Sequence, residues 1–345
     1  MSGDQRRVLF DHPAHLEKMG LRLVRSGQGA QALALARQAL VARPGDPLIA
    51  VLAGRILYHR IPTYHYAMLR DRPRNAAYRH AIEALAPGRV VLDVGTGSGL
   101  LAMLAARAGA AHVHACEANP MLATTAREIV AANGLTERIT VHSCHSGRLD
   151  RVRDLGGGAD LVVSEILAHD LLGERVLPSL AHARAELTAP GALFLPEHAS
   201  VRVALAVEPD GYTPLGEVEG FDLSLFNRHV KKGRLSRDQE PGFTLRSAPA
   251  DLLTFDFSAE LPMEGRARAT LSSLGGTVTG IAQWMHIDLG GGATYENPPG
   301  TNREGHWRAG YYPLATPRET VAGEAVSVHG WHGEDSIAIW ADARS

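Results

Sequence analysis

The stretch VLDVGTGSG, residues 91–99, limits what this chain can fold into more than any other part of its 345 residues. It begins in a continuous apolar run, which is typical of a parallel strand buried on both faces of a sheet. Gly95, Gly97 and Gly99 then form a turn, and the segment LLAMLAARAGA that follows has the composition of a helix. A glycine turn that joins a buried strand to a helix predicts a site for a nucleotide-like ligand.

An acidic residue stands after the next predicted strand, HVHACE. Glu117 closes that strand and follows Gly99 by 18 residues. A carboxylate at this place accepts hydrogen bonds from ribose hydroxyls, so the pattern predicts a cofactor that contains adenosine. A tight turn alone would explain the glycines but not Glu117. Asp93, ahead of the first glycine, makes the turn more acidic than a pyrophosphate site, which favours S-adenosylmethionine over NAD.

The segments after Glu117 repeat the alternation of strand and helix. NPMLATTAREIVAANG is predicted to be a helix that ends at Asn133 and Gly134, ITVHSC and ADLVVSEI to be strands, and SLAHARAELTAPGALFL to add a helix and a strand. We therefore predict an α/β fold, a doubly wound Rossmann-like domain over residues 61–197. Residues 64–85 precede the first strand and are predicted to form a helix broken near Pro73.

The two flanking regions differ from this central domain. Residues 1–60 are predicted to be helical, and their small and apolar positions fit a tetratricopeptide unit of about 34 residues. About one and a half such units cannot bury a solenoid core, so a helical hairpin docked on the next domain and a partner-binding platform both stay open. Residues 198–345 alternate apolar and polar residues between turns, which predicts an antiparallel β-barrel. The polar stretch from Asn227 to Pro241 interrupts that pattern.

Composition and charge exclude several classes of function. The net charge is -2, so no strongly basic field recruits nucleic acid or an anionic membrane. The two cysteines and 17 histidines show no metal-ligand spacing such as HExxH, and no GxSxG elbow points to a serine hydrolase. The N-terminus lacks the apolar core of a signal peptide, and no apolar run is long enough to span a bilayer. We expect a cytoplasmic protein that uses no metal, nucleic acid or membrane.

Two glutamates in SEILAHDLLGE, residues 164–174, are the strongest catalytic candidates. Glu165 ends the fourth predicted strand, at the carboxyl edge of the sheet where α/β sites lie, and Glu174 follows nine residues later. Two solvated surface charges are the alternative interpretation. The cofactor pattern upstream favours a pair of carboxylates that act on one substrate group. His169 and Asp170 lie between them and receive no role.

Five motifs, in this order, make the chain resemble the protein arginine methyltransferase family from about Tyr64 to about Leu314. They are YHYAMLRDRPRNAAY, VVLDVGTGSGLLAMLAARAGAAHVHACE, SEILAHDLLGE, GFDLSLFNRH and GHWRAGYYPL. In that family the first motif covers the cofactor, the third carries two glutamates, and the fourth begins a dimerisation arm. The third motif and the segment CHS at residues 144–146 are most similar to monomethylating (type III) members and to a member with N-terminal tetratricopeptide repeats.

The resemblance implies S-adenosyl-L-methionine as cofactor and a role for each matching residue. On the cofactor side, the turn would be shaped by Asp93, Gly95, Gly97 and Gly99. Glu117 would hold the ribose, and Arg74 would pair with the methionine carboxylate. The adenine would be contacted by Ser146 or by backbone groups at Gly147. On the substrate side, Glu165 and Glu174 would bind a guanidinium, and its pocket would be lined by Tyr64 and Trp307. Met68 would lie beside the transferred methyl group, and Asp71 would pair with His306 across the domain interface.

Two carboxylates suit such a substrate. A guanidinium is planar and stays protonated at ordinary pH, and carboxylates bind it with paired hydrogen bonds. They hold positive charge on the nitrogens they contact, so lone-pair character concentrates on the nitrogen that faces the methyl. Correct positioning then supplies much of the remaining rate enhancement.

The sequence departs from the family pattern at three places. Gly305 precedes His306 where the family has a threonine, and Gly147 stands where many members carry an adenine-binding glutamate. Arg175 and Val176 follow Glu174 where dimethylating members place Ser-Met. Their bulk would limit the product to one methyl group.

Three functions are compatible with these observations. We favour methylation of free L-arginine or a small derivative in a bacterial natural-product pathway, because the near-neutral charge does not suit a groove for basic peptides. A composition rich in Ala, Arg and Gly is also typical of a bacterium. Methylation of protein arginine is the second hypothesis. A catalytically silent binding module is the third, and the intact glutamates and glycine turn speak against it. The arm near residues 221–241 predicts a homodimer.

Overall fold

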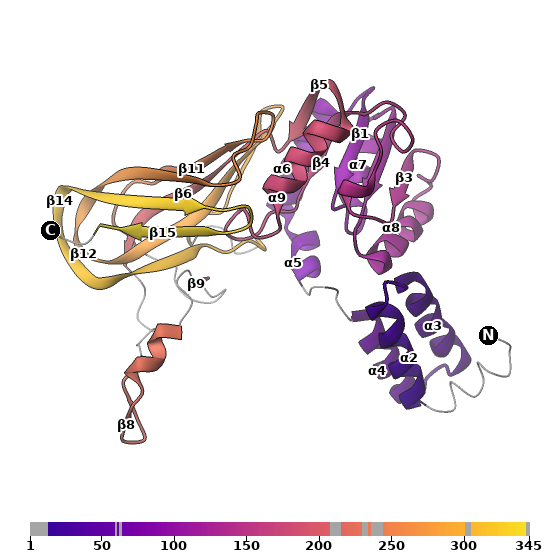
Figure 1. The fold of residues 1–345 in the computed structure, drawn as a ribbon, viewed down its shortest axis with the longest axis horizontal. Helices are drawn as coiled ribbons and strands as arrows, with labels where there is room; N and C mark the ends of the chain where they lie inside the picture. Colours follow the sequence, from indigo (N-terminus) through magenta and orange to yellow (C-terminus); the bar gives the residue numbers. More distant parts are fainter. Residues whose placement is uncertain are drawn as a thin grey trace. The chain divides into compact units, whose positions relative to one another are not determined.

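The computed structural model describes residues 13–58, 61, 64–207, 215–229, 234–235, 244–300 and 305–342 (Figure 1). Contacts divide the chain into two compact units. The first unit comprises Met1–Ala67, Ile82–Glu165 and Glu186–Gly191, and the second comprises Met68–Ala81, Ile166–Ala185 and Ala192–Ser345. Each unit collects separate stretches of sequence, so the division into three consecutive domains, 1–60, 61–197 and 198–345, stays a prediction.

A five-stranded sheet in the order β3-β2-β1-β4-β5 forms the centre of the first unit. Its strands are β1 (Val90–Val94), β2 (His112–Cys116), β3 (Ile139–His142), β4 (Ala159–Ser164) and β5 (Thr188–Leu195), the last of which runs on into the second unit. β1 pairs in parallel with β2 and β4, and four of its five residues are buried, as its apolar run predicts. The Rossmann-like fold is confirmed.

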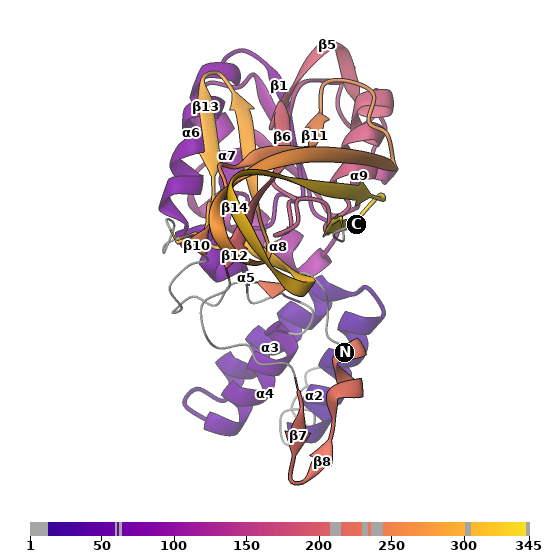
Figure 2. The ribbon, with the colours of Figure 1, turned by 90° about the vertical axis from the view of Figure 1, so that its left-hand side faces the viewer.

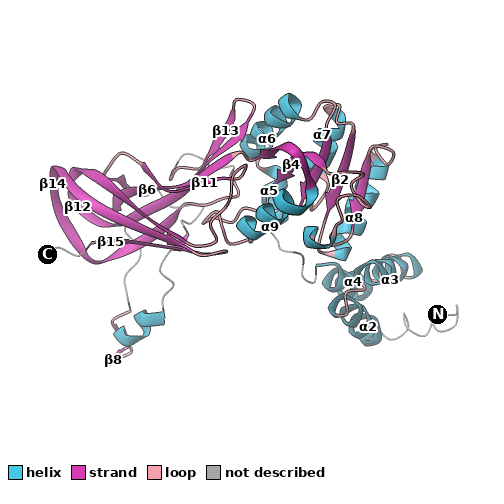
Figure 3. Ribbon diagram, turned by 45° about the horizontal axis from the view of Figure 1, so that its top comes forward, coloured by secondary structure: helices cyan, strands magenta, loops and turns pink. Residues whose placement is uncertain are grey.

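Helices connect these strands in the expected order. α7 (Leu100–Arg107) follows the glycine turn, α8 (Pro120–Ala132) joins β2 to β3, and α9 (Val176–His182) with a π-helical turn (Ala183–Leu187) leads to β5 (Figure 3). Asn119 caps α8, because its Oδ1 accepts a hydrogen bond from Met121 N at 3.0 Å. Asn133 and Gly134 end α8 as predicted, and Gly134 has a φ of 70°.

The helical stretch before β1 is divided as predicted, but the break lies two residues before the proline. α5 (Tyr64–Arg70) and α6 (Arg72–Leu85) are separated by Asp71, and Pro73 falls in the first turn of α6. Proline is tolerated there because its missing N–H would have no helical partner. Asp71 Oδ1 accepts a hydrogen bond from Arg74 N at 2.9 Å and so begins the new helix.

From residue 13 on, where the structure describes the chain, the N-terminal part of the first unit contains three helices: α2 (Pro13–Arg25), α3 (Gly29–Ala42) and α4 (Pro47–Tyr58). We call them the N-terminal helices. They pack closely through small residues, and a Cβ on Gly20 would come within 2.3 Å of Ile56 Cδ1. Their shared core also includes Met121 of α8. The predicted helical character of this region is confirmed, whereas its likeness to tetratricopeptide repeats stays a prediction.

An antiparallel sheet of eight strands dominates the second unit (Figure 2). Its central path is β10 (Thr244–Leu245), β6 (His198–Val207), β12 (Gly265–Gly290), β14 (Gly310–His332) and β15 (Ile337–Ala341), with β9 (Arg234–Leu235), β11 (Ala250–Asp256) and β13 (Ala293–Glu296) at its sides. Trp284 and Tyr311 are buried in one of its cores, where a Cβ on Gly280 would collide with the Tyr311 ring. The antiparallel architecture is confirmed, and closure into a barrel stays a prediction.

The predicted arm begins as a small exposed excursion from this sheet. β7 (Glu217–Val218) and β8 (Phe221–Asp222) form a hairpin, and a 3-10 helix (Ser224–His229) follows. Phe221 and Leu225 are each 70% exposed, so this segment offers apolar surface to a partner. The rest of the arm, apart from β9, lies outside the described residues. None of the described helices is long and apolar enough to cross a membrane.

Candidate functional site

The turn after β1 needs glycine at three positions. Gly95, Gly97 and Gly99 have φ values of 77°, 54° and 84°, in the left-handed region that other residues rarely adopt. The N–H groups of Gly95 and Thr96 both donate to Cys116 O at 3.0 Å, which ties the turn to the end of β2. The turn is therefore held as a cradle at the carboxyl edge of the sheet, where ligands of α/β proteins bind.

Asp93 supports this turn from inside the protein. Its side chain is buried, and Oδ2 accepts hydrogen bonds from Thr96 Oγ1 at 2.5 Å and from Ala102 N at 3.1 Å. Ala102 lies in the first turn of α7, so one carboxylate fixes both the loop and the start of the helix. These contacts suit a residue that shapes the cradle and does not itself touch the ligand.

Glu117 is held beside the cradle by two backbone donors. Its Oε2 accepts a hydrogen bond from Gly97 N at 3.0 Å, and its Oε1 accepts one from Asn119 N at 2.7 Å. Burial raises the pKa of Glu117, and these hydrogen bonds oppose that shift by favouring the ionised form. The carboxylate thus has a fixed position at the edge of the turn, which is what recognition of two ribose hydroxyls requires.

The hydroxyl group of Ser146 is suited to contact a ligand. This serine opens a short 3-10 helix (Ser146–Arg148), and its Oγ is buried with no hydrogen-bond partner among the described residues. Gly147 N already donates to His145 Nδ1 at 3.1 Å. Because buried polar groups are nearly always satisfied, an orphaned hydroxyl suits a polar group of a bound molecule such as adenine. Ser146 is therefore a better candidate for that contact than the Gly147 backbone.

The cysteines are not suited to nucleophilic chemistry. Cys116 and Cys144 are free thiols. Burial raises the pKa of Cys116 to about 12, so it stays protonated, and burial also raises the pKa of Cys144. Among the residues that the structure covers, no cluster of His, Cys, Asp or Glu side chains could hold a metal ion.

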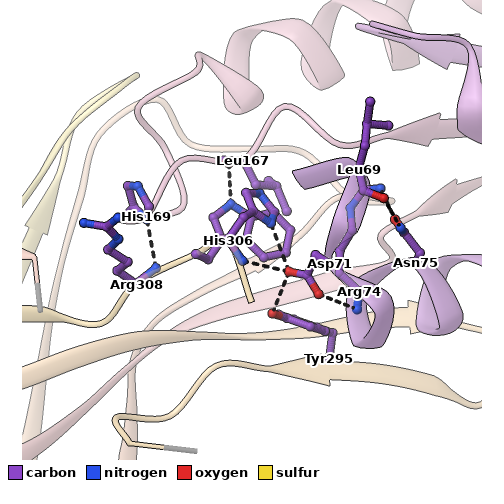
Figure 4. Close-up of polar contacts among 10 residues, drawn as sticks. Leu69, Asp71, Arg74, Asn75, Leu167, His169, Tyr295, His306 and Arg308 are labelled. Carbon is purple, nitrogen blue, oxygen red and sulfur yellow. Dashed lines mark hydrogen bonds and ion pairs between the residues drawn. The ribbon is translucent and has the colours of Figure 1, made fainter. Parts of the chain in front are cut away.

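Asp71 is the centre of a buried network in the second unit (Figure 4). Its Oδ2 accepts hydrogen bonds from His306 Nδ1 and His306 N, each at 3.0 Å, and a longer one from the Tyr295 hydroxyl at 3.4 Å. Burial on its own would raise the pKa of Asp71, but the hydrogen bonds from His306 and Arg74 outweigh it and lower that pKa. Burial lowers the pKa of His306, and Asp71 opposes this shift. Asp71 is therefore an anion, and His306 donates to it as a neutral ring.

Arg74 follows one helical turn after Asp71. Its side chain is buried, its Nη1 donates to Asn75 Oδ1 at 2.7 Å, and its guanidinium lies 4.8 Å from the centre of the Tyr78 ring. Asn75 Nδ2 in turn donates to Leu69 O at 2.9 Å. These contacts orient a buried cation, which suits the binding of a carboxylate. Met68, on α5 one turn before Asp71, is half-buried.

Trp307 and His169 join two distant loops of the second unit. Trp307 is buried, and its Nε1 donates to Leu167 O at 2.8 Å. His169 Nδ1 accepts a hydrogen bond from Arg308 N at 2.9 Å (Figure 4). In addition, Gln283 Nε2 donates to His169 O at 3.2 Å. The loop after Glu165 is thus hydrogen-bonded to the loop after His306 and to β12.

The loop that carries Glu174 has an unusual backbone. Leu171 and Arg175 have φ values of 75° and 62°, although neither is glycine. Asp170 Oδ1 accepts a hydrogen bond from Gly173 N at 2.9 Å, and a Cβ on Gly173 would come within 2.9 Å of Ala168 Cβ. Left-handed residues of this kind concentrate at functional sites, where surrounding contacts hold them.

The two glutamates of this loop fall in different units. Glu165 is half-buried and is the last residue of its stretch in the first unit, whereas Glu174 is exposed and belongs to the second. Tyr64 is half-exposed at the start of α5, and its ring centre lies 4.7 Å from that of His65.

Sequence reasoning missed several residues that organise the site. The His65 ring lies 3.8 Å from the position that a Cβ on Gly97 would take, so it borders the cradle, and burial lowers its pKa. His65 stands in the motif that resembles the cofactor-covering helix, which was a usable signal. His169 and Gln283 had no such signal, because their partners lie more than 100 positions away in the sequence.

Comparisons with known proteins agree with this geometry. The profile of the family described as ribosomal protein L11 methyltransferase (PrmA) matches residues 80–195, the region of the five-stranded sheet. An arginine N(omega)-methyltransferase from Streptomyces achromogenes subsp. streptozoticus is 40% identical over 325 residues, which cover 91% of this chain and 89% of that protein. A probable protein arginine N-methyltransferase 6.1 from Oryza sativa subsp. indica is 43% identical over 175 residues, 49% of this chain and 45% of its own length.

Solved structures extend the likeness beyond the cofactor sheet. The Trypanosoma brucei PRMT1 enzyme-prozyme complex with AdoHcy matches with a TM-score of 0.70 at 25% identity and covers 84% of this chain and 95% of its own. Arabidopsis thaliana protein arginine methyltransferase 10 shares the fold, with a TM-score of 0.65 at 22% identity over 79% of this chain and 89% of its own. The chain belongs to the protein arginine methyltransferase family and is an S-adenosylmethionine-dependent arginine methyltransferase.

Proposed function

We propose that this enzyme transfers one methyl group to a guanidino nitrogen of free L-arginine or a small arginine derivative, in a bacterial natural-product pathway. The observation that carries the proposal is the nearly end-to-end match to the Streptomyces arginine N(omega)-methyltransferase. The match to the rice protein arginine methyltransferase covers only about half of either chain. A net charge of -2 also offers no strongly acidic surface for a basic peptide.

The contacts with the cofactor are proposed residue by residue. Gly95, Gly97 and Gly99 form the cradle, and Asp93 shapes it from inside. Glu117 accepts hydrogen bonds from the ribose hydroxyls. Further contacts are proposed for Arg74 with the methionine carboxylate and for Ser146, beside Gly147, with the adenine. S-adenosylmethionine, when bound, supplies an electrophilic methyl group on a sulfonium.

The substrate guanidinium is proposed to be held by Glu165 and Glu174. Each carboxylate can accept two hydrogen bonds from the planar cation, so the pair fixes its plane and its rotation. The charge that they hold on the bound nitrogens leaves the remaining nitrogen as the better nucleophile. Tyr64 and Trp307 line the pocket in this proposal, and Met68 flanks the methyl that is transferred.

The reaction releases one proton, because substrate and product are both guanidinium cations at neutral pH. We assign the acceptor role to His306. It donates its Nδ1 hydrogen to Asp71, so its Nε2 is the basic atom of the neutral ring. Asp71 stabilises the imidazolium that forms and keeps the ring in this tautomer, as a carboxylate does for a catalytic histidine in general.

Monomethylation is proposed from the residues that follow Glu174. Val176 is fully buried at the start of α9, where it is held in place. The Arg175 side chain is held by the turn between β14 and β15, with its Nη2 3.4 Å from Glu334 Oε2. Of these two residues only Arg175 is larger than its counterpart in dimethylating members, so Arg175 carries the proposed steric limit. Replacement of Arg175 by serine, the residue of dimethylating members at this place, should yield dimethylated product in a mass spectrum.

Other features stay proposals of the same kind. We propose a cytoplasmic homodimer that uses the arm near residues 221–241, three consecutive domains, and a tetratricopeptide-like origin for the N-terminal helices. A monomeric mass by light scattering at micromolar concentration would contradict the dimer.

One experiment tests the substrate class. The protein is incubated with labelled S-adenosylmethionine and either free L-arginine or a Gly/Arg-rich peptide, and the products are identified by mass spectrometry. We expect label in free arginine, with one methyl group. Label in the peptide alone would support the second candidate, protein arginine methylation, which the names of the rice relatives favour. Label in neither would revive a silent binding module.

A further inference from the structure

The N-terminal helices pack against the first turn of α8. Met121 in that turn is 2% exposed, and it shares one apolar core with residues of α2, α3 and α4 such as Leu16, Ala36 and Ile56. Arg37 of α3 also donates to both carboxylate oxygens of Glu128, further along α8. That ion pair is exposed, so the apolar contact at Met121 carries most of the attachment.

Gly29 allows this contact to be unusually close. A Cβ at Gly29 would lie 2.7 Å from Met121 Cγ, 2.9 Å from Met121 N and 3.2 Å from Pro120 Cβ. Gly29 has no left-handed φ, so glycine is needed here for space rather than for backbone freedom. The backbone of α8 blocks the added atom, which means that a larger residue must push α3 away from α8 or move the first turn of α8.

A short series of hydrogen bonds leads from that turn to the cofactor site. Met121 N donates to Asn119 Oδ1 at 3.0 Å, and Asn119 N donates to Glu117 Oε1 at 2.7 Å. The other oxygen of Glu117 accepts from Gly97 N in the cradle. Met121, in contact with the N-terminal helices, therefore lies only four positions along the chain from Glu117, the carboxylate proposed to hold the ribose.

We propose that the N-terminal helices are a positioning element of the cofactor site. Their packing against Met121 fixes the position of the first turn of α8. Through its hydrogen bonds with Met121 N and Glu117 Oε1, Asn119 then fixes the position of the Glu117 carboxylate. Met121 is on this view a positioning residue that never touches the cofactor. The inference rests on the proposed role of Glu117 in ribose binding. It gives these helices a function within the enzyme that needs no partner protein.

Two alanine substitutions at helix glycines provide the test. Gly29→Ala places a methyl against the α8 backbone, whereas Gly54→Ala on α4 meets only the Tyr58 ring, at 3.4 Å, and is the matched control. Binding of S-adenosylhomocysteine to the full chain is measured by calorimetry, well below the unfolding midpoint. We expect the Kd to rise about tenfold for Gly29→Ala, since small misplacements of a binding group are costly. For Gly54→Ala the Kd stays within about twofold of the wild-type value.

Kinetics separate positioning from general damage. At saturating S-adenosylmethionine, kcat and the KM for arginine should stay within about twofold in Gly29→Ala, while the KM for the cofactor rises in step with the Kd. Met121→Ala loosens the contact without a clash and should raise the Kd several-fold. Met121→Leu keeps a large apolar side chain and should leave the Kd near the wild-type value. This second pair keeps the test decisive if Gly29→Ala does not fold.

The outcomes divide clearly. A lower unfolding temperature with an unchanged Kd in Gly29→Ala and Met121→Ala would overturn the inference and leave the helices a merely structural role. Glu117→Gln distinguishes this failure from failure of the proposed function. If Glu117→Gln leaves the Kd unchanged, the ribose assignment is wrong. If Glu117→Gln raises the Kd but the Gly29 and Met121 variants do not, the inference alone fails.

Discussion

The cofactor cradle of the first unit and the histidine network of the second are built in opposite ways. The cradle takes its parts from one short stretch, Asp93 to Asn119, and puts glycine at each left-handed position of the turn. The network gathers Asp71, Tyr295 and His306 from distant places, and the nearby loop holds two non-glycine residues at positive φ. The cradle is a local structure, while the network exists only when the second unit has folded.

This difference separates the expected effects of mutations. Changes in the cradle should alter cofactor affinity, because its contacts are made in the binding-competent enzyme before any reaction. Changes in the network and the double-glutamate loop should alter kcat at saturating cofactor, because they affect groups that act on the substrate.

The largest effect is expected for Glu165→Gln. Removing one carboxylate charge from the proposed guanidinium clamp should lower kcat by about 1,000-fold or more, since groups that stabilise reaction charge contribute at this level. The Kd for S-adenosylhomocysteine should stay within about twofold, because Glu165 is not part of the cradle. Turnover is measured by mass spectrometry and binding by calorimetry. Glu137→Gln, at an exposed position after α8, is the matched control. A large loss of cofactor binding would show that Glu165 is structural.

A smaller but still large loss is expected for Asp71→Asn. The amide can keep the cap on Arg74 N, but its nitrogen cannot accept from His306, so the ring loses its fixed tautomer. We expect kcat to fall about 100-fold, in the range of lost acid-base catalysis. Tyr295→Phe removes the 3.4 Å hydrogen bond to the same oxygen, keeps the aromatic ring and is the control. Equal losses in both variants would mean that packing, not tautomer control, is what matters.

His169 provides a test of the connection between the loops. His169→Leu removes the acceptor for Arg308 N, so the loop after Glu165 loses one tie to the loop after His306. An unsatisfied buried donor costs about 1–3 kcal/mol, and the lower end of that range applies to this half-buried donor. That cost corresponds to about a tenfold loss in kcat if the loop must be in place for turnover. His169→Asn keeps an acceptor near the place of Nδ1 and should retain most of the activity. A loss in the asparagine variant as large as in leucine would contradict this explanation.

The same difference between the local cradle and the long-range network decides what could be predicted from the sequence. The turn and Glu117 could be predicted because their partners lie within about 30 residues and the glycines meet a strict backbone requirement, and the strand could be predicted from its continuous apolar run. The Asp71–His306 pair was predicted only by resemblance to a family. His169 and Gln283 were not predictable, because a single histidine or glutamine in a sequence says nothing about a carbonyl or N–H group more than 100 positions away.

Helix boundaries show the limit of local signals in a second way. Pro73 correctly indicated a break in the helix before β1, yet the break lies at Asp71, since proline fits the first turn of a helix and the preceding aspartate caps it. The close approach of Gly29 to Met121 had no sequence signal, because a glycine inside a helical pattern is usually interpreted as a turn or a cap. Packing between helices decided that position.

Acid should destabilise the first unit through His114. Burial, followed by the neighbouring His112 and His142, lowers the pKa of His114 from 6.5 to about 4, while Asp154 opposes the shift and Arg127 faces the adjacent His142. The unfolded chain therefore binds a proton between pH 6.5 and about 4 that the native protein does not. The contribution of His114 to the free energy of unfolding should be constant above pH 6.5 and should fall as the pH drops toward 4.

Urea unfolding at several pH values measures this contribution. Because His114 is only about half-buried, we expect a loss of about 1–2 kcal/mol across that window, less than the full shift would imply. His114→Gln should flatten the dependence, whereas the half-exposed His198→Gln of the second unit should not. The same slope in wild type and His114→Gln would assign the acid sensitivity to other groups, with the Asp71–His306 pair as the next candidate.

The smallest effect is expected for Arg175→Gly, which makes the second unit's loop resemble the cradle. Arg175 adopts a φ of 62°, and its exposed ion pair with Glu334 contributes little, so glycine should relieve the strain and stabilise the protein by about 0.5–1 kcal/mol. Leu171, at a φ of 75°, is fully buried, so Leu171→Gly should instead destabilise by loss of apolar burial. Urea unfolding measures both.

If the strained backbone helps to hold Glu174 in place, Arg175→Gly should also lower kcat about twofold to fivefold despite the added stability. A more stable variant with unchanged kcat would mean that the left-handed residues of this loop, unlike the glycines of the cradle, have no part in the chemistry.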